Sequence, residues 1–238
     1  MTDVRAQSRL DIRPFASLGH ADHGWLNARH HFSFADYQDE GRMNWGSLRV
    51  WNDDAIAPGT GFPPHPHADM EIITYVREGA ITHRDSLGNE GRTVAGDVQV
   101  MSAGTGIRHS EYNREGEETR LFQIWIIPDR RGGEPGWGAR QFPKQAGGGW
   151  TVFASGMDGD ENALPIRASA RVLGTRLSKG QSIDYSVGEG RHAYLVPATG
   201  SIELDGERID ARDGVAFRGG EYRITALDDA ELILVDSV

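Results

Sequence analysis

Residues 62–71 read Phe-Pro-Pro-His-Pro-His-Ala-Asp-Met-Glu and lead directly into the β-like segment Met70–Val76. His65 and His67 stand two positions apart in this stretch. Side chains at positions i and i+2 of an extended chain point to the same face, so both imidazoles are presented to one point. Pro66 removes a backbone donor between them, which indicates the edge or the start of a strand. The stretch therefore predicts a strand that offers two neighbouring metal ligands.

A second stretch, residues 104–113, repeats this arrangement with the sequence Gly-Thr-Gly-Ile-Arg-His-Ser-Glu-Tyr-Asn. Here His109 and Glu111 stand two positions apart. The two pairs together offer three imidazoles and one carboxylate, a mixed donor set that suits Fe(II), Ni(II), Cu(II), Mn(II) or Zn(II). Residue types alone do not choose among these ions. The alternative is that both pairs are ordinary polar residues on loops.

Short β-like segments surround both stretches and continue to the end of the sequence. They are rich in Val, Ile, Tyr, Phe and Trp, and Gly-containing turns separate them. Long stretches with apolar residues at helical spacing are absent. The expected strands are Leu48–Trp51, Met70–Val76, Ala80–Arg84, Asp97–Met101, Leu121–Ile127, Thr151–Ala154, Val172–Leu177, His192–Val196, Ser201–Leu204, Gly214–Phe217 and Glu231–Asp236. This pattern predicts an all-β barrel or sandwich.

Gly-rich runs without apolar periodicity fill much of 129–149, which we expect to be a linker between two units, 1–128 and 150–238. Histidine is distributed unevenly between these units. Eight of the nine histidines lie at or before position 109, and only His192 lies in the second unit. If the units are related, only the first has kept a His-rich site.

Composition excludes several classes of protein. The 238 residues carry 25 Lys and Arg against 35 Asp and Glu, a net charge of −10 that disfavours direct binding to nucleic acid. There is no Cys, and therefore no disulfide, thiol nucleophile or Cys-based metal site. The longest apolar runs are too short to span a bilayer, and the N-terminus lacks an apolar signal core. We expect a soluble, cytoplasmic protein.

The two His-containing stretches also resemble the two cupin motifs. The first motif is matched by Gly59, His65, His67, Glu71 and Gly79, and the second by Gly96, Gly104, Gly106, His109 and Asn113. A Ser replaces the usual Pro at position 102, two extra residues precede His109, and Glu111 follows it. These departures resemble the pirin branch of the cupin superfamily, especially its short bacterial members. Further resemblance lies in HHFSFADY (30–37), LRVWNDD (48–54), HPHADMEIITYV (65–76) and SAGTGIRHSEYN (102–113).

This resemblance implies a bicupin, an all-β protein of two β-barrel (double-stranded β-helix or jelly-roll) domains with a metal site only in the first. It implies one divalent transition metal per chain, with Fe(II) as the expected ion and Ni, Mn, Cu or Zn as alternatives. The implied metal ligands are His65, His67, His109 and Glu111. Glu71 occupies the usual cupin carboxylate position, but we expect it to support the site rather than bind metal, and Asp69 is a lesser rival.

The resemblance further implies an enzyme, a quercetin 2,3-dioxygenase-type oxidoreductase that opens a flavonol ring with O2 and releases carbon monoxide. Glu111 is then the expected catalytic base, which accepts the proton of the flavonol 3-hydroxyl. The alternative function is a metal-bearing, redox-responsive regulatory or binding protein without turnover. The expected partners are a small aromatic or enolic substrate and O2, with no nucleic acid and no membrane. We expect a monomer, and the sequence identifies no protein partner.

Several other residues could serve the site. His30 and His31 either line the mouth of a pocket or are surface or capping histidines, and we expect His83 to be an ordinary strand residue. Aromatic residues could form walls for a flat substrate or belong to the plain core. These aromatic residues are Phe32, Phe34, Trp45, Trp51 and Trp125.

Overall fold

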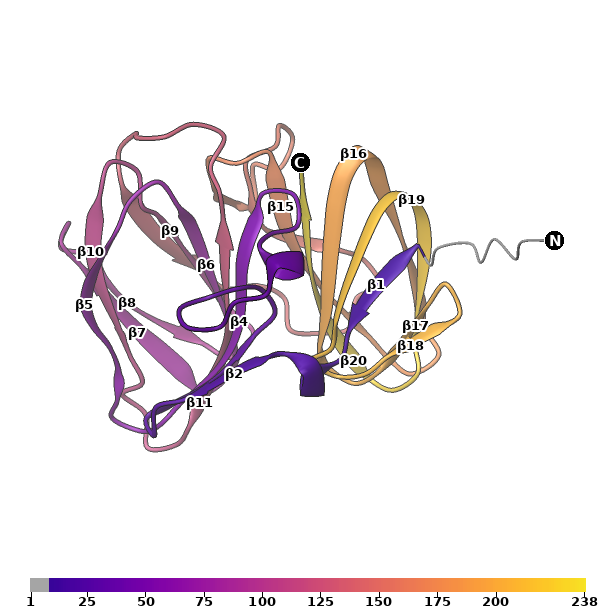
Figure 1. The fold of residues 1–238 in the computed structure, drawn as a ribbon, viewed down its shortest axis with the longest axis horizontal. Coiled ribbons are helices and arrows are strands. Elements are labelled where there is room, and N and C mark those ends of the chain that lie inside the picture. Colours follow the sequence, from indigo (N-terminus) through magenta and orange to yellow (C-terminus); the bar gives the residue numbers. More distant parts are fainter. Residues whose placement is uncertain (1–8) are drawn as a thin grey trace.

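β-Strands make up most of the chain, as the short apolar segments predict. The computed structural model describes residues 9–238, and within them two short 3-10 helices, Phe15–Ser17 and Glu40–Arg42, interrupt the strands. Figure 1 shows two barrels side by side, the first in indigo to magenta and the second in orange and yellow. The all-β fold expected from the sequence is confirmed. Neither helix of the described residues is long and apolar enough to cross a membrane.

Two antiparallel sheets form the first barrel. The larger has the order β12 (Gly136–Arg140), β9 (Val98–Ser102), β6 (Glu71–Glu78), β11 (Thr119–Ile126), β4 (Leu48–Ile56), β3 (Leu26–His30) and β2 (Gly19–Asp22). The smaller has the order β5 (Gly61–His67), β10 (Ile107–Tyr112), β7 (Ala80–Asp85) and β8 (Glu90–Val94).

A single sheet curls to form the second barrel. Its order is β14 (Leu164–Pro165), β13 (Thr151–Ser155), β15 (Ala170–Leu177), β20 (Ala230–Ser237), β16 (Ser182–Thr199), β19 (Gly214–Ala226), β17 (Ile202–Leu204) and β18 (Glu207–Ile209). The early strand β1 (Leu10–Arg13) adds to the free side of β19, so the first part of the described chain belongs to the second barrel (Figure 1).

The segment expected to be a linker is partly a strand. Strand β12 lies within 129–149 and pairs with β9 of the first barrel, so the Gly-rich composition conceals a strand. At the other end of the chain, the Ser47 amide donates to the carbonyl of Val238, which ties the C-terminus to the first barrel. The domain boundaries at 128 and 150 remain a prediction, and residues 1–8 lie outside the described residues.

The back of the larger sheet packs against the second barrel. Along β11, Phe122, Ile124 and Ile126 face a core that residues of both barrels share, including Trp51 and Tyr194. The alternate residues of β11, among them Gln123, face the interior of the first barrel, because successive side chains of a strand point to opposite faces. The alternation thus fixes which residues of the sheet can reach a site inside that barrel.

Candidate metal centre

The pairing of β5 with β10 brings the two His-containing stretches together. His109 lies directly opposite His65 in the antiparallel register, and Ile107 lies opposite His67. The Nε2 atoms of His65 and His109 are 3.0 Å apart. One ligand atom from each of His65, His67 and His109 lies within 4.8 Å of the others, so the three rings can serve a single ion.

Two of these imidazoles, His67 and His109, favour the neutral form that binds metal. Burial, together with the neighbouring imidazoles, lowers the pKa of His109 to about 2. Burial and the nearby His65 lower the pKa of His67 to about 4. A metal must displace protons from its ligands, and at neutral pH these rings have none to displace from the ligating nitrogen. The donor set therefore fits a divalent transition ion.

Glu111 lies beside this cluster inside the barrel, 2% exposed. Its Oε1 accepts hydrogen bonds from Gln99 Nε2 at 2.7 Å and Thr74 Oγ1 at 3.3 Å, and its Oε2 accepts from Gln123 Nε2 at 3.0 Å. Burial raises the pKa of Glu111 to about 7, against the effect of these hydrogen bonds. Its carboxyl group can therefore take up a proton near neutral pH.

The orientation of the Gln123 amide is determined by a further donor. Trp125 Nε1 donates to Gln123 Oε1 at 3.1 Å, and an indole N–H can only donate. The Gln123 amide nitrogen must therefore face Glu111. Thr93 Oγ1 donates to Gln99 Oε1 at 3.0 Å, which is consistent with the Gln99 amide nitrogen facing Glu111. The sequence does not mark these glutamines, because each sits singly in a strand that otherwise reads as apolar.

The four expected ligands do not form one compact group. The structure places Glu111 within 4.8 Å of ligand atoms of His109 and His83, in a second group that is fully buried. His65 and His67 belong to the first group only. His109 is therefore the residue that the two groups share, and binding of Glu111 to the ion of the first group remains a prediction.

His83 is closer to the site than expected. Its Nδ1 lies 3.4 Å from His109 Nδ1, and its Nε2 lies 3.1 Å from Asp85 Oδ2. Trp137 stacks on the His83 ring, with centroids 4.8 Å apart and planes 7° apart. If Asp85 accepts from His83 Nε2, then His83 Nδ1 can accept from His109 Nδ1, which leaves His109 Nε2 free for a metal. The signal in the sequence is again a spacing of two, His83 with Asp85 on β7.

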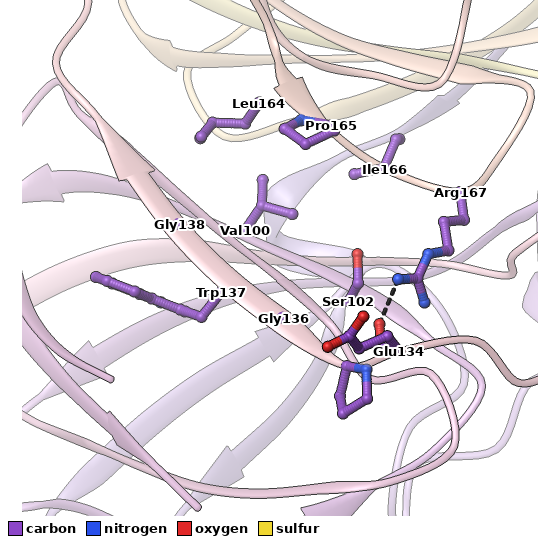
Figure 2. A pocket seen from close by; sticks show the side chains of 11 residues that line it. Val100, Ser102, Glu134, Gly136, Trp137, Gly138, Leu164, Pro165, Ile166 and Arg167 are labelled. Atoms are coloured by element: carbon purple, nitrogen blue, oxygen red, sulfur yellow. Dashed lines mark hydrogen bonds between the residues drawn. The ribbon is translucent and has the colours of Figure 1, made fainter. Parts of the chain in front are cut away.

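The two rival carboxylates have other partners. Glu71 accepts a hydrogen bond from Ser102 Oγ, and Asp69 Oδ1 accepts from the Gly132 amide at 2.6 Å. Within residues 9–238 neither belongs to a group that could hold a metal. Ser102 lines a groove of about 350 Å³ between the barrels, which Figure 2 shows with Arg167 donating to the Glu134 carbonyl. Glu71 thus lies toward this groove and away from the imidazole cluster.

A separate cavity of about 330 Å³ is lined by residues that contact the cluster, although the three imidazoles themselves do not line it. Phe62 on its wall contacts the His65 ring, and Phe34 contacts Trp125, which in turn contacts the His67 ring. Gln123 also lines the cavity and bonds Glu111. The other lining residues are His20, Ala21, His23, Leu26, Ala28, His30, Ala35, Asp36, Tyr37, Asn52 and Asp54.

The two adjacent histidines have different places, and neither lies on the surface. His30 lines the cavity, and its Nδ1 is 2.8 Å from Asn52 Oδ1. His31 lies in the core between the barrels, with its Nδ1 2.8 Å from the Tyr194 hydroxyl. Of the expected aromatic walls, Phe34 lines the cavity, whereas Phe32 and Trp51 belong to the shared core.

Comparison with known proteins agrees with this architecture. The Pirin family model matches residues 11–126, and a model described as the quercetinase C-terminal cupin domain matches residues 152–237. A pirin-like protein of Caulobacter vibrioides is 62% identical over 230 residues, which cover 96% of this chain and 99% of the relative. A quercetin 2,3-dioxygenase of Escherichia coli K12 is 40% identical over 227 residues, 94% of this chain and 97% of the relative.

The fold of a solved structure is also similar over nearly the whole chain. A bacterial pirin from Escherichia coli, in complex with nickel(II), aligns with a TM-score of 0.90 and 39% identity, covering 96% of this chain and 98% of that one. The expected bicupin architecture is confirmed by this match and by the cupin model over the second barrel. Within residues 9–238, the groups that could hold a metal lie in the first barrel alone.

Proposed function

The chain belongs to the pirin family of the cupin superfamily, and on that premise we propose that it is a metal-dependent dioxygenase acting on a flavonol such as quercetin. The reaction takes the flavonol and O2 to a ring-opened product and carbon monoxide. The observation that carries this proposal is the cluster of three imidazoles beside Glu111, in contact with Phe62 and Gln123 of the lining of an aromatic-walled cavity. The E. coli relative that bears this enzyme name supports it.

We propose that His65, His67 and His109 hold the ion together with Glu111. The three rings already lie within reach of one another, and a carboxylate oxygen of the buried Glu111 lies within 4.8 Å of a His109 ring nitrogen. Fe(II) is the proposed ion, and nickel is the ion bound in the E. coli pirin structure. When bound, such an ion supplies Lewis acidity and redox chemistry at this point.

The chain's own contribution to the reaction is a proton acceptor. A Glu111 oxygen takes the proton of the flavonol 3-hydroxyl, and the pKa of Glu111 near 7 suits this task at neutral pH. Oε2 is the proposed acceptor atom, because its donor, Gln123, also lines the cavity. Gln123 must withdraw its hydrogen bond for the substrate hydroxyl to reach Oε2. Phe34 and Phe62 hold the flat rings between them in this arrangement.

The test is anaerobic reconstitution with Fe(II), Ni(II), Mn(II), Cu(II) and Zn(II) in turn, followed by quercetin and O2. Quercetin loss and carbon monoxide release are measured together. We expect turnover with at least one ion, no turnover in His65→Ala, and unchanged turnover in the matched control His192→Ala in the second barrel. Stoichiometric metal binding without quercetin turnover would overturn the proposal and favour a metal-bearing binding protein.

A further inference from the structure

The cavity beside the imidazole cluster has polar groups, besides Gln123, that the proton-transfer step does not use. Asn52 and Asp54 lie on the same face of β4, two positions apart, and both line the cavity. Phe34, Phe62 and Leu26 provide apolar wall. A cavity of this size, with apolar walls and a few polar groups, has the general character of a small-molecule site.

Asp54 is the buried polar group in this cavity that lacks a partner. It is 1% exposed, and its Oδ1 has no hydrogen-bond partner within the described residues. Asp53, the next residue on β4, faces the opposite way and forms ion pairs with Arg77 and Arg212. Asp54 takes part in no ion pair in the described part of the chain. A buried polar atom without a partner destabilises the fold, and a ligand that satisfied it would remove that cost.

The surroundings of Asp54 favour its protonated, neutral form. Burial raises the pKa of Asp54 well above its usual range, and the charges of Asp53 and Glu111 act in the same direction against Arg77. A protonated carboxyl group can both donate and accept a hydrogen bond. A phenolic hydroxyl, which also donates and accepts, is its natural complement.

The charge of the lining points to the same class of ligand. The cavity lining includes Asp36 and Asp54 but no Arg or Lys. Burial lowers the pKa of His30, so this ring is neutral as well. A carboxylate or phosphate would find no Arg or Lys to pair with here, whereas a neutral hydroxylated ring would find both apolar wall and hydrogen-bonding groups.

We propose that this cavity is the subsite for a hydroxylated aromatic ring of the substrate, and that Asp54 selects polyphenols by hydrogen bonding a ring hydroxyl. The inference rests on the proposed function, because residues that line the cavity contact the same imidazole cluster. Asp54 acts on substrate choice and not on proton abstraction, which remains with Glu111.

The test is equilibrium binding to the metal-loaded protein without O2, followed by quenching of tryptophan fluorescence. Two probes are compared: quercetin, and 3-hydroxyflavone, which keeps the enolic 3-hydroxyl but has no other ring hydroxyl. The wild-type protein is expected to prefer quercetin, and Asp54→Leu to reduce that preference about ten-fold, the effect of one hydrogen bond to a buried acid. Binding of 3-hydroxyflavone should be little changed. Asp54→Asn, which is neutral and both donates and accepts, should keep most of the preference.

Asp53→Asn is the matched control, because it alters the same strand on the face away from the cavity. It should lower the unfolding temperature by breaking the pairs with Arg77 and Arg212, yet leave the preference for quercetin intact. If Asp54→Leu does not fold, Ala21→Trp at the cavity rim replaces it. This variant fills the cavity and should weaken binding of both flavonols.

Two results would overturn the inference: an unchanged preference in Asp54→Leu, or wild-type binding of both flavonols in Ala21→Trp. Loss of the preference in Asp54→Asn as complete as in Asp54→Leu would overturn the role of Asp54 as a neutral acid. These outcomes are separable from failure of the dioxygenase proposal, because binding is measured without turnover. Absent turnover together with an Asp54-dependent preference would remove the enzyme and leave the subsite.

Discussion

The interiors of the two barrels are filled differently. Polar side chains point into the first barrel. There Glu111 accepts hydrogen bonds from Thr74, Gln99 and Gln123. In the second, the strands turn aliphatic and aromatic side chains inward. Among these are Leu173, Ile183, Leu195, Ile202, Val215, Phe217, Ile224, Leu232 and Leu234, all buried in one cluster. The same kind of barrel thus encloses a hydrogen-bonded polar network in one case and a packed apolar core in the other.

This difference assigns separate tasks to the two barrels. A buried polar network is tolerated only where its members are bonded, and Glu111 accepts three hydrogen bonds accordingly. The second barrel has an apolar interior and needs no such network of hydrogen bonds. Its outward-facing residues Val196, Ile233 and Val235 pack on the back of the larger sheet of the first barrel. We infer that the apolar barrel braces the sheet from which the polar site is built.

The largest expected effect is on catalysis in the first barrel. Glu111→Gln keeps the shape and neutrality of a protonated Glu111 but cannot accept a proton, so kcat should fall by about 10²–10⁴-fold, the usual contribution of a general base. Flavonol turnover under saturating substrate, together with metal content, measures this effect. We expect bound metal to be retained. Equal turnover in the variant would remove the base role from Glu111.

The second barrel should respond in stability and not in metal binding. Leu234 is fully buried in its interior, and Leu234→Ala should lower the free energy of unfolding by about 2–5 kcal/mol through lost contacts and the cavity left behind. Urea unfolding and metal titration of the same sample separate the two quantities. His65→Ala is the reciprocal control and should lose metal with little loss of stability. Weakened metal binding in Leu234→Ala would show that the barrels are not separable in this way.

Sequence patterns predicted the parts of this comparison that depend on spacing along one strand. The pair His65 and His67, and the pair His109 and Glu111, could be recognised because side chains two apart share a face. The strand register that sets His65 opposite His109 could not be read from one sequence, although the resemblance to a known family implied that they meet. The concentration of histidine in the first half of the sequence likewise predicted that the first barrel holds the polar site.

The polar residues that surround the metal ligands could not be predicted from the sequence. Leu48–Trp51 was the expected strand, but β4 continues through Ile56 and carries Asn52 and Asp54 into the cavity. Asn and Asp are depleted in β-strands, and three such residues, Asn52, Asp53 and Asp54, follow the expected strand directly. Backbone pairing with β11 nevertheless continues the strand to Ile56, and the polar interior of the barrel accommodates the Asn52 and Asp54 side chains. The role of Gln123 could not be predicted either, because only the closed barrel shows which face of β11 points inward.

The polar interior should also make stability depend on pH. The pKa of Glu111 is raised from 4.5 to about 7 in the folded protein, so the unfolded chain ionises first as pH rises. The contribution of Glu111 to the stability of the metal-free protein should therefore fall by roughly 3 kcal/mol as pH rises from about 4.5 through 7. Glu111→Gln lacks this contribution. The lowered pKa values of His67 and His109 act in the opposite direction, but they are common to both proteins and cancel in the comparison.

Urea unfolding of the metal-free wild type and Glu111→Gln at pH 5 and pH 8 measures this effect. The stability of the wild type relative to the variant should be greater at pH 5 than at pH 8. A difference that does not change with pH would mean that Glu111 ionises with an ordinary pKa despite its burial. The second barrel is identical in the two proteins, so its pH-dependent contribution to the free energy of unfolding cancels in the comparison.

The smallest expected effect concerns the residue that the sequence suggested was ordinary. His83 lies between Asp85 and His109, and in this place it fixes which nitrogen of His109 faces the cluster. His83→Phe keeps the stack on Trp137 but removes both nitrogens, so metal affinity should fall by about 10–100-fold, as when the outer partner of a metal-binding histidine is lost. Competition with a chelator measures the affinity without reference to turnover.

The conservative variant His83→Gln distinguishes positioning from packing. Its amide can accept from His109 and donate to Asp85, so it should recover much of the affinity that His83→Phe loses. His192→Phe in the second barrel, far from the cluster, should leave affinity unchanged. Because His83, His109 and Glu111 also form a group that could hold an ion, the stoichiometry decides between the two roles. Two ions bound per chain, with one lost in His83→Phe, would make His83 a ligand; one ion throughout, with weaker binding in His83→Phe, supports positioning.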